Sequence, residues 1–296
     1  MTLDQADKLR NIIKASQVAN PNSARVITVT SGKGGVGKSN VAINLAVKFK
    51  SAGKKVIIFD ADFGLANIEV MFGAIPKHSL ADLIYQGASI KDVITWGPMG
   101  IGFISGGSGI AGMGNLSRDH LDYLIRNLAE LDTLADVIII DTAAGISEAV
   151  LEFLVASREI ILVTTPEPTS ITDSYSLLKA LNLHERFKKE ETLVKVITNK
   201  VETTEEGKQL YSKLSAVVNR YLKLKMEFLG VVPYDNALVK AVMQQSPVSI
   251  SNPQTRAAKA FTDIADTLMN IPHTETVYRK GMSGFFANIL AGRKFS

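Results

Sequence analysis

The feature that most constrains this chain is a glycine-rich segment, Gly32 to Ser39, which reads Gly-Lys-Gly-Gly-Val-Gly-Lys-Ser. A β-branched run, Val26 to Thr30, precedes it, and a helical pattern over 40–50 follows it. The pattern G-x-x-x-x-G-K-[ST] between a strand and a helix is typical of a loop whose backbone N–H groups surround phosphate oxygens. The segment therefore predicts an α/β fold with a phosphate site where a strand meets a helix.

The rest of the chain alternates short apolar runs with helical patterns. Strands are expected over 55–60, 101–105, 136–141, 160–165, 194–199 and 228–233. Helices are expected over 147–157, 169–183, 205–221, 236–244 and 253–270. Apolar strands that alternate with helices are typical of a mainly parallel sheet covered on both faces. We predict a doubly wound α/β domain over 21–273, preceded by a helix and linker (1–20) and followed by a further helix (274–296).

Composition excludes several classes of protein. The chain has no cysteine, which excludes disulfides, thiolate zinc sites and cysteine-ligated iron–sulfur clusters. No run of about 18 apolar residues is present, and the first ten residues lack the apolar core of a secretory signal, so a cytoplasmic protein is expected. Basic residues number 33 against 29 acidic ones, and four of the basic ones lie in the acid-free segment 279–296. The body is therefore charge-balanced, and no sequence-specific nucleic-acid partner is expected.

Each position of the glycine-rich segment has an expected task. Lys38 is expected to reach the β- and γ-phosphates of a nucleotide, and the Ser39 hydroxyl is expected to bind Mg²⁺. The remaining positions are expected to cradle the phosphates with backbone N–H groups: Gly32, Lys33, Gly34, Gly35, Val36 and Gly37.

Acidic residues end two of the expected strands. Asp141 closes the apolar run 136–141, where a carboxylate can hold a metal ion directly or through water. Asp60 ends the strand 55–60 and Asp62 follows it, at the edge where open α/β sheets bind ligands. A capping or turn role is the alternative for Asp60 and Asp62, because Asp is common after strands.

A second lysine in the loop, Lys33, gives the segment a family resemblance. The form K-G-G-V-G-K-S resembles the deviant Walker A ATPases, which include MinD, ParA, ArsA and the nitrogenase iron protein. The resemblance implies ATP and ADP as ligands, Mg²⁺, and an ATP-bound homodimer in which Lys33 reaches the partner's phosphates. It also implies that Asp62 positions the attacking water, with Asp60 near Mg²⁺, because Asp62 to Asn67 resembles the family's switch motif D-x-G-L-x-N. The alternative for Lys33 is a charge beside the ligand of its own subunit.

Three further residues are expected at the nucleotide base. Asn199 ends a later strand, and its side chain offers both a donor and an acceptor to an adenine edge, as the resemblance also implies. Pro233 and Tyr234, after the last strand, are expected to cover the base from the other side.

Two elements point to one branch of the family. The N-terminal element with Asp4, Gln5, Ala6, Leu9 and Arg10, and the sequence Asp-Thr-Ala-Ala-Gly from Asp141, resemble the flagellar-number regulators known as FlhG, FleN or YlxH. This resemblance implies control of flagellar placement and number, contacts with flagellar C-ring proteins, and stimulation of the GTPase FlhF through the N-terminal helix, chiefly by Gln5. A coincidental match, a ParA-type DNA-partitioning ATPase and a P-loop enzyme with a small-molecule substrate are the alternatives.

The C-terminal segment carries an apolar stripe at helical spacing. Its members are Met282, Phe285, Phe286, Ile289 and Leu290. Basic residues flank the stripe, among them Arg293 and Lys294, which suits a helix lying on an anionic membrane at the inner face. The alternative is a helix packed on the body. A combination of the two is also open, in which the ADP-bound monomer holds the helix in a groove and ATP-driven dimerisation releases it.

Overall fold

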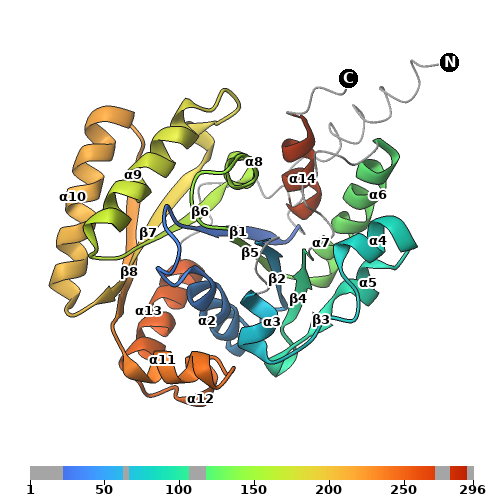
Figure 1. Ribbon diagram of the computed structural model, residues 1–296, viewed down its shortest axis with the longest axis horizontal. Coiled ribbons are helices and arrows are strands. Elements are labelled where there is room, and N and C mark those ends of the chain that lie inside the picture. The colour runs from blue at the N-terminus through green and yellow to red at the C-terminus, as the bar shows by residue number, and fades with distance from the viewer. Residues whose placement is uncertain (1–22, 63–66, 107–117, 271–280, 292–296) are drawn as a thin grey trace.

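The centre of the molecule is an eight-stranded sheet with the order β3-β4-β2-β5-β1-β6-β7-β8. The computed structural model describes residues 23–62, 67–106, 118–270 and 281–291 (Figure 1). The strands are β1(Arg25–Thr30), β2(Val56–Ala61), β3(Thr95–Trp96), β4(Gly102–Ser105), β5(Val137–Thr142), β6(Glu159–Thr164), β7(Leu193–Val201) and β8(Met226–Pro233). Neighbouring strands are parallel except for β3, which pairs antiparallel to β4. The predicted fold class is therefore confirmed.

The strands β2, β5 and β6 are buried at every position, as their apolar runs predicted. In β5, Val137 and Ile139 belong to one core cluster, whereas Ile138 and Ile140 belong to the cluster on the other face. Successive side chains of a strand point to opposite faces, so a strand with apolar residues at every position needs a helical layer on each side.

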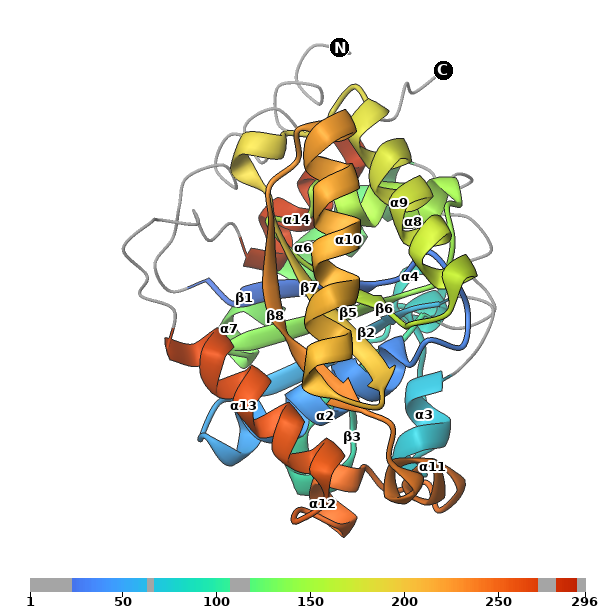
Figure 2. The same ribbon diagram turned by 90° about the vertical axis from the view of Figure 1, so that its left-hand side faces the viewer.

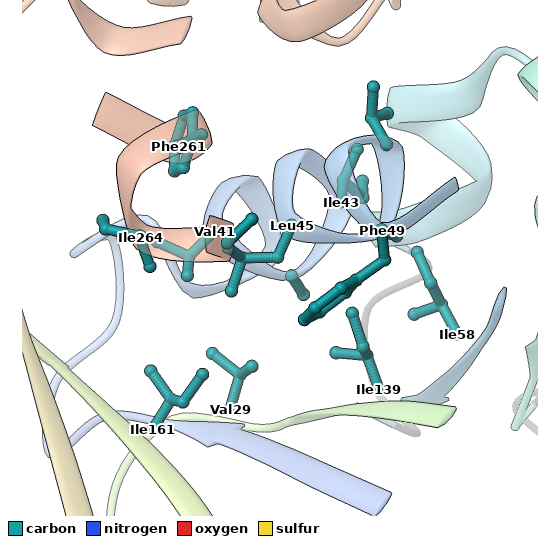
Figure 3. Packing of buried hydrophobic residues seen from close by; sticks show 14 of the residues in the cluster. Val29, Val41, Ile43, Leu45, Phe49, Ile58, Ile139, Ile161, Phe261 and Ile264 are labelled. Carbon is teal, nitrogen blue, oxygen red and sulfur yellow. The ribbon is translucent and has the colours of Figure 1, made fainter. Parts of the chain in front are cut away.

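One face of the sheet is covered by the helix that follows the glycine-rich segment. Leu45 and Phe49 of this helix, α2, point toward the strands, and Ile264 of α13 lies beside Val41 of α2 (Figure 3). The helices of this layer are α2(Lys38–Ser51), α3(Asn67–Phe72), α11(Asn236–Met243), α12(Val248–Ser251) and α13(Arg256–Asn270).

The opposite face carries the larger helical layer (Figures 1 and 2). Its helices are α4(Leu80–Gln86), α5(Ile90–Val93), α6(Arg118–Ala129), α7(Leu131–Leu134), α8(Glu148–Ala156), α9(Pro168–Leu183), α10(Thr204–Leu222) and α14(Gly281–Ala291). Two 3₁₀ turns, Pro98–Gly100 and Lys189–Glu191, complete the described elements.

The C-terminal stripe does not face outward. Met282, Phe285, Phe286 and Ile289 are each at most 3% exposed, and α14 lies between α6 and α8 (Figure 1). The ring of Phe286 lies 5.6 Å from that of Phe59 in β2, centroid to centroid. In this conformation the stripe buries its apolar surface on the body, as the packed-helix alternative and the combined arrangement both expect, and its contact with a membrane stays a prediction. The side chain of Leu290, together with Arg293 and Lys294, lies outside the described residues.

Charged side chains of the body hold both ends of α14. At the N-terminus, Asp132 Oδ1 accepts a hydrogen bond of 2.7 Å from the backbone N–H of Met282. Toward the C-terminus, Arg186 Nη1 donates to the carbonyl oxygen of Asn288 at 2.7 Å, and Arg186 also pairs with Glu152 of α8. A negative charge at a helix N-terminus and a positive charge at its C-terminus both complement the helix dipole. The docking of α14 is therefore polar at its ends and apolar along its length.

Two other predictions concern segments beyond the core. The N-terminal helix, with Asp4, Gln5, Ala6, Leu9 and Arg10, lies outside the described residues. Within the described ranges, no helix is long and apolar enough to cross a membrane.

Candidate nucleotide site

The glycine-rich segment joins β1 to α2 at the carboxyl edge of the parallel strands, as predicted. Gly35 and Gly37 have φ values of 75° and 98°, the left-handed region that glycine tolerates. A Cβ atom on Gly32 would lie 2.2 Å from the carbonyl group of Asp173 in α9, so only glycine fits there. Lys38 begins α2 and is 8% exposed. The loop, the start of α2 and α9 are thus packed closely together.

Side chains outside the loop hold three of its carbonyl oxygens. Ser31 Oγ donates to the carbonyl oxygen of Lys33 at 2.8 Å. Asn199 Nδ2 donates to that of Val36 at 2.7 Å, and Lys200 Nζ donates to that of Gly35 at 2.8 Å. These contacts were not predicted from the sequence. The structure shows the Asn199 side chain buried against the loop at 2% exposure, and its expected contact with an adenine edge stays a prediction.

Two buried carboxylates lie side by side next to the loop. Asp60 of β2 and Asp141 of β5 are register partners, 2% and 0% exposed. Burial, reinforced by Asp141, raises the pKa of Asp60 to about 8. Burial also raises the pKa of Asp141 to about 6, although the Ser39 hydroxyl and the Lys38 ammonium oppose this rise. Burial and mutual repulsion thus disfavour two negative charges here without a compensating cation.

The residues at this position fit a magnesium ion. Among the described residues, no group makes a well-formed hydrogen bond to either oxygen of Asp141, which leaves a buried carboxylate with unused acceptors. In the part of the chain that the structure describes, no cluster of three or more histidine, aspartate or glutamate side chains could hold a metal ion. Mg²⁺ in nucleotide sites uses one or two carboxylates, a hydroxyl and phosphate oxygens, and Asp141, Asp60 and Ser39 offer the carboxylates and the hydroxyl of that set.

Asp60 and Asp62 are linked through the turn that follows β2. Asp60 accepts hydrogen bonds from the backbone N–H groups of Asp62 at 3.1 Å and Ile68 at 3.4 Å, so the turn role considered for Asp60 is present. Asn67 Nδ2 donates to Asp62 Oδ2 at 3.4 Å. The motif residues Asp62 and Asn67 are therefore in contact, and residues 63–66 between them lie outside the described ranges.

Lys33 is paired within its own chain. Its Nζ atom lies 2.6 Å from Glu167 Oε2 and 2.8 Å from Thr169 Oγ1, both at the start of α9. The pairing lowers the pKa of Glu167. In the single chain Lys33 is thus held by residues of its own subunit. A contact in trans requires it to leave Glu167, and both that contact and a place beside the ligand of its own subunit stay predictions.

Pro233 and Tyr234 lie at the same sheet edge as the loop. Pro233 ends β8 opposite Val201 of β7, and the Tyr234 side chain is 45% exposed. The Tyr234 hydroxyl donates to Asn236 Oδ1 at 3.3 Å. Their contact with a base stays a prediction.

A phosphate loop between β1 and α2, with acidic residues ending the neighbouring strands, defines a P-loop nucleotide-binding protein. A family model described as ParA, NUBPL iron-transfer P-loop NTPase, matches residues 22–269. The antiactivator FleN of Pseudomonas aeruginosa is 39% identical over 256 residues, which cover 86% of this chain and 90% of FleN. The flagellum site-determining protein YlxH of Helicobacter pylori is 32% identical over 297 residues, with 97% and 98% covered.

A solved structure shows the same fold. The septum site-determining protein MinD of Pyrococcus horikoshii, complexed with Mg-ADP, has a TM-score of 0.65 at 23% identity and covers 83% of this chain and 96% of its own. The chain belongs to the ParA/MinD family of P-loop ATPases, and the predicted resemblance to FleN and YlxH is confirmed. As a member of this family the protein is an ATP hydrolase.

Proposed function

We propose that this protein is an ATP-driven switch that dimerises with ATP bound, associates with the membrane and regulates flagellar placement and number. The observation that carries the nucleotide part of the proposal is the buried pair Asp60 and Asp141 beside Lys38 and Ser39. Asp60, Asp141 and Ser39 would hold a divalent cation, whose charge would compensate the buried carboxylates and the phosphates of ATP. The loop N–H groups and Lys38 would hold those phosphates.

Asp62 is proposed to position the attacking water. Phosphoryl transfer depends chiefly on positioning and charge stabilisation, so removing the carboxylate spares binding but slows the chemical step. Asp62→Ala should bind ATP within about twofold of wild type and lose roughly 100-fold in turnover, the range of a positioned acid–base group. Phosphate release and ATP affinity, measured on the same preparation, check this result. Normal turnover in Asp62→Ala would remove Asp62 from the mechanism.

Lys33 is proposed to exchange partners when two subunits meet. In the single chain its ammonium pairs with Glu167 and Thr169, on the exposed side of the loop. The ion pair is exposed at both partners, and exposed pairs contribute little stability. A partner's phosphates, which carry more charge than one carboxylate, would draw Lys33 across the interface. Lys33 then acts in trans as an arginine finger does in other P-loop enzymes.

The flagellar part of the proposal rests on relatives. FleN is described as an antiactivator and YlxH as a flagellum site-determining protein, and both align with most of this chain. The N-terminal element with Gln5 supports FlhF as a partner GTPase, and the same relationship supports C-ring proteins as partners.

Deletion of residues 1–20 tests the FlhF partnership. The deletion should leave ATP turnover within about twofold of wild type, because Asn20 and Pro21 precede the first strand and no site residue is removed. The same deletion should abolish stimulation of FlhF GTPase, and Gln5→Ala should weaken it. Lys8→Ala, in the same segment, serves as the matched control. Full stimulation by the truncated chain would exclude the N-terminal helix as the activator.

Membrane association is proposed to require the release of α14, because its apolar stripe is buried in the conformation described above. Removing one hydrogen bond to a charged donor costs about 1.5 kcal/mol or more, which corresponds to roughly tenfold in the docking equilibrium. Arg186→Ala removes the contact with the Asn288 carbonyl and should therefore raise binding to anionic vesicles in MgADP toward the wild-type level in MgATP. Vesicle flotation measures this binding.

Arg158→Ala is the control for that variant, because Arg158 pairs with Glu191 away from α14. It should leave vesicle binding unchanged. If wild type in MgATP and Arg186→Ala in MgADP both ignore anionic vesicles, the release proposal fails and α14 is a permanent part of the body.

A further inference from the structure

Side chains from outside the phosphate loop hold its backbone at three points. Carbonyl oxygens of Lys33, Gly35 and Val36 accept hydrogen bonds from Ser31, Lys200 and Asn199 respectively. Ser31 precedes the loop in sequence, whereas Asn199 and Lys200 come from β7, more than 160 residues later. In the sheet, β6 separates β7 from β1, so these two side chains reach the loop across a neighbouring strand.

The orientation of these carbonyls decides whether the loop can bind phosphate. A loop that holds an anion must turn its N–H groups inward and its carbonyl oxygens outward, because an inward carbonyl dipole repels phosphate oxygens. Glycines at 34, 35 and 37 give this backbone unusual freedom, so its peptide groups can rotate easily. A hydrogen bond to the outer side of a carbonyl group opposes that rotation.

The hydrogen bonds of the Asn199 side chain suit it to act as a brace, that is, a side chain that holds the loop backbone in one conformation. Its Oδ1 atom accepts from the backbone N–H of Lys200 at 2.9 Å while its Nδ2 atom donates to Val36. A backbone N–H only donates and a carbonyl oxygen only accepts, so both contacts require the same orientation of the side-chain amide. The fit is close, because a Cβ atom on Gly37 would lie 2.4 Å from Asn199 Nδ2.

Lys200 shares this arrangement. Its φ of 57° is uncommon for a residue with a side chain, and such conformations persist where the surroundings hold them. In this conformation its backbone N–H orients Asn199 and its Nζ atom reaches Gly35. One strand end thus contacts two successive carbonyl groups of the loop.

We infer that Asn199 and Lys200 are positioning residues that keep the phosphate loop in its binding conformation by holding the Val36 and Gly35 carbonyl oxygens outward. The inference rests on the proposed nucleotide site and adds to it two residues that act through the loop backbone. It differs from a base contact by Asn199, which would act on the adenine ring and not on phosphate.

A ligand without a base separates the two roles. Inorganic tripolyphosphate carries the phosphate chain of ATP and no ring, so a brace affects the binding of both ligands, whereas a base contact affects ATP alone. Asn199→Ala should weaken MgATP and magnesium tripolyphosphate by the same factor, about tenfold, as expected for one lost buried hydrogen bond. Asn199→Asp should behave like Asn199→Ala, since a carboxylate cannot donate to Val36. Calorimetry gives both affinities.

Variants of Lys200, which is exposed, provide a second test. Lys200→Met should weaken both ligands by about threefold to tenfold, and Lys200→Arg should restore most of the loss, because a guanidinium can still donate to Gly35. Lys213→Met, an exposed lysine of α10, is the matched control and should bind both ligands as wild type does. A melting temperature recorded without ligand shows whether each variant is folded.

The outcomes separate this inference from the proposed site. If Asn199→Ala weakens ATP but leaves tripolyphosphate unchanged, Asn199 contacts the base and the brace is wrong. If Asn199→Ala fails to fold, the affinities of Lys200→Met and Lys200→Arg for the two ligands test the inference instead. Tripolyphosphate binding that is unchanged in Lys200→Met would overturn the role of Lys200. If wild type binds neither ligand, the nucleotide site itself has failed.

Discussion

Lys38→Ala is expected to abolish ATP binding at millimolar concentrations, a loss of at least about 100-fold in affinity. Lys38 begins α2 directly after the phosphate loop and is 8% exposed. Hydrogen bonds from a charged donor to phosphate contribute about 1.5–3 kcal/mol each, and Lys38 is placed to make more than one of them. Its loss also removes a positive charge that opposes the raised pKa of Asp141.

Calorimetric titration with MgATP measures the effect of Lys38→Ala. Lys54→Ala is the control, because Lys54 is exposed and follows the end of α2 opposite to the loop. Wild-type affinity in Lys38→Ala would mean that phosphate binds elsewhere in the protein.

Glu159→Ala is expected to lower the free energy of unfolding by about 3–5 kcal/mol, as when one partner of a buried ion pair is removed. Glu159 and Lys195 are 5% and 2% exposed. Glu159 Oε1 accepts from Lys195 Nζ at 2.8 Å and from Arg25 Nη2 at 2.7 Å, and Arg25 Nε donates to Oε2 at 2.8 Å. Without Glu159, the Lys195 ammonium is left buried with no opposing charge from this network.

Urea unfolding at pH 7 measures the loss in Glu159→Ala. Glu191→Ala is the matched control, since Glu191 pairs with Arg158 on the surface with a side chain 43% exposed, and it should lose less than about 1 kcal/mol. A loss of similar size in both variants would contradict the account of the buried network.

The same network makes stability depend on pH. Burial alone would raise the pKa of Glu159, but hydrogen bonds and charges from Arg25 and Lys195 outweigh it and hold the pKa below its usual value. The resulting stabilisation is fully present above the unfolded pKa of about 4.3 and is lost as pH falls through the lower folded pKa. The difference in the free energy of unfolding between wild type and Glu159→Gln should therefore become smaller below about pH 4.

The fold could be predicted because the strands are unbroken apolar runs. The run 136–141 corresponds to β5 within one residue at each end, since a strand buried on both faces is apolar throughout. The two-residue β3 was missed, and so were the helices α3, α4, α5, α6, α7 and α12. Ser79 with Asp82 and Ser89 with Asp92 form capping boxes, so the sequence did carry a signal for α4 and α5.

The candidate site was predictable where its residues lie in one motif or at the ends of neighbouring parallel strands. The loop and the acidic residues at strand ends could be placed because β1, β2 and β5 share a carboxyl edge. The contact of Asn199 with Val36 depends on a separation of 163 residues, which no local pattern records. Likewise, the pairing of Lys33 with Glu167 became visible only when α9 was placed beside the loop.

The spacing of the C-terminal stripe could not show which surface the stripe contacts. A helix that lies on lipid and one that packs on a core show the same apolar period. Tertiary contacts with Phe59 and Phe153, together with Asp132 and Arg186 at the helix ends, determine which surface it meets in this conformation.

The mass of the protein in solution, measured by light scattering with MgATP and with MgADP, tests the switch most directly. Asp62→Ala is the preparation of choice, because this variant is expected to leave ATP intact during the measurement. The account predicts twice the chain mass of 32.0 kDa with MgATP and the single-chain mass with MgADP. The double variant Lys33→Ala, Asp62→Ala should stay at the single-chain mass with either nucleotide. A single-chain mass for Asp62→Ala saturated with MgATP, or an ATP-dependent dimer without Lys33, would contradict the account.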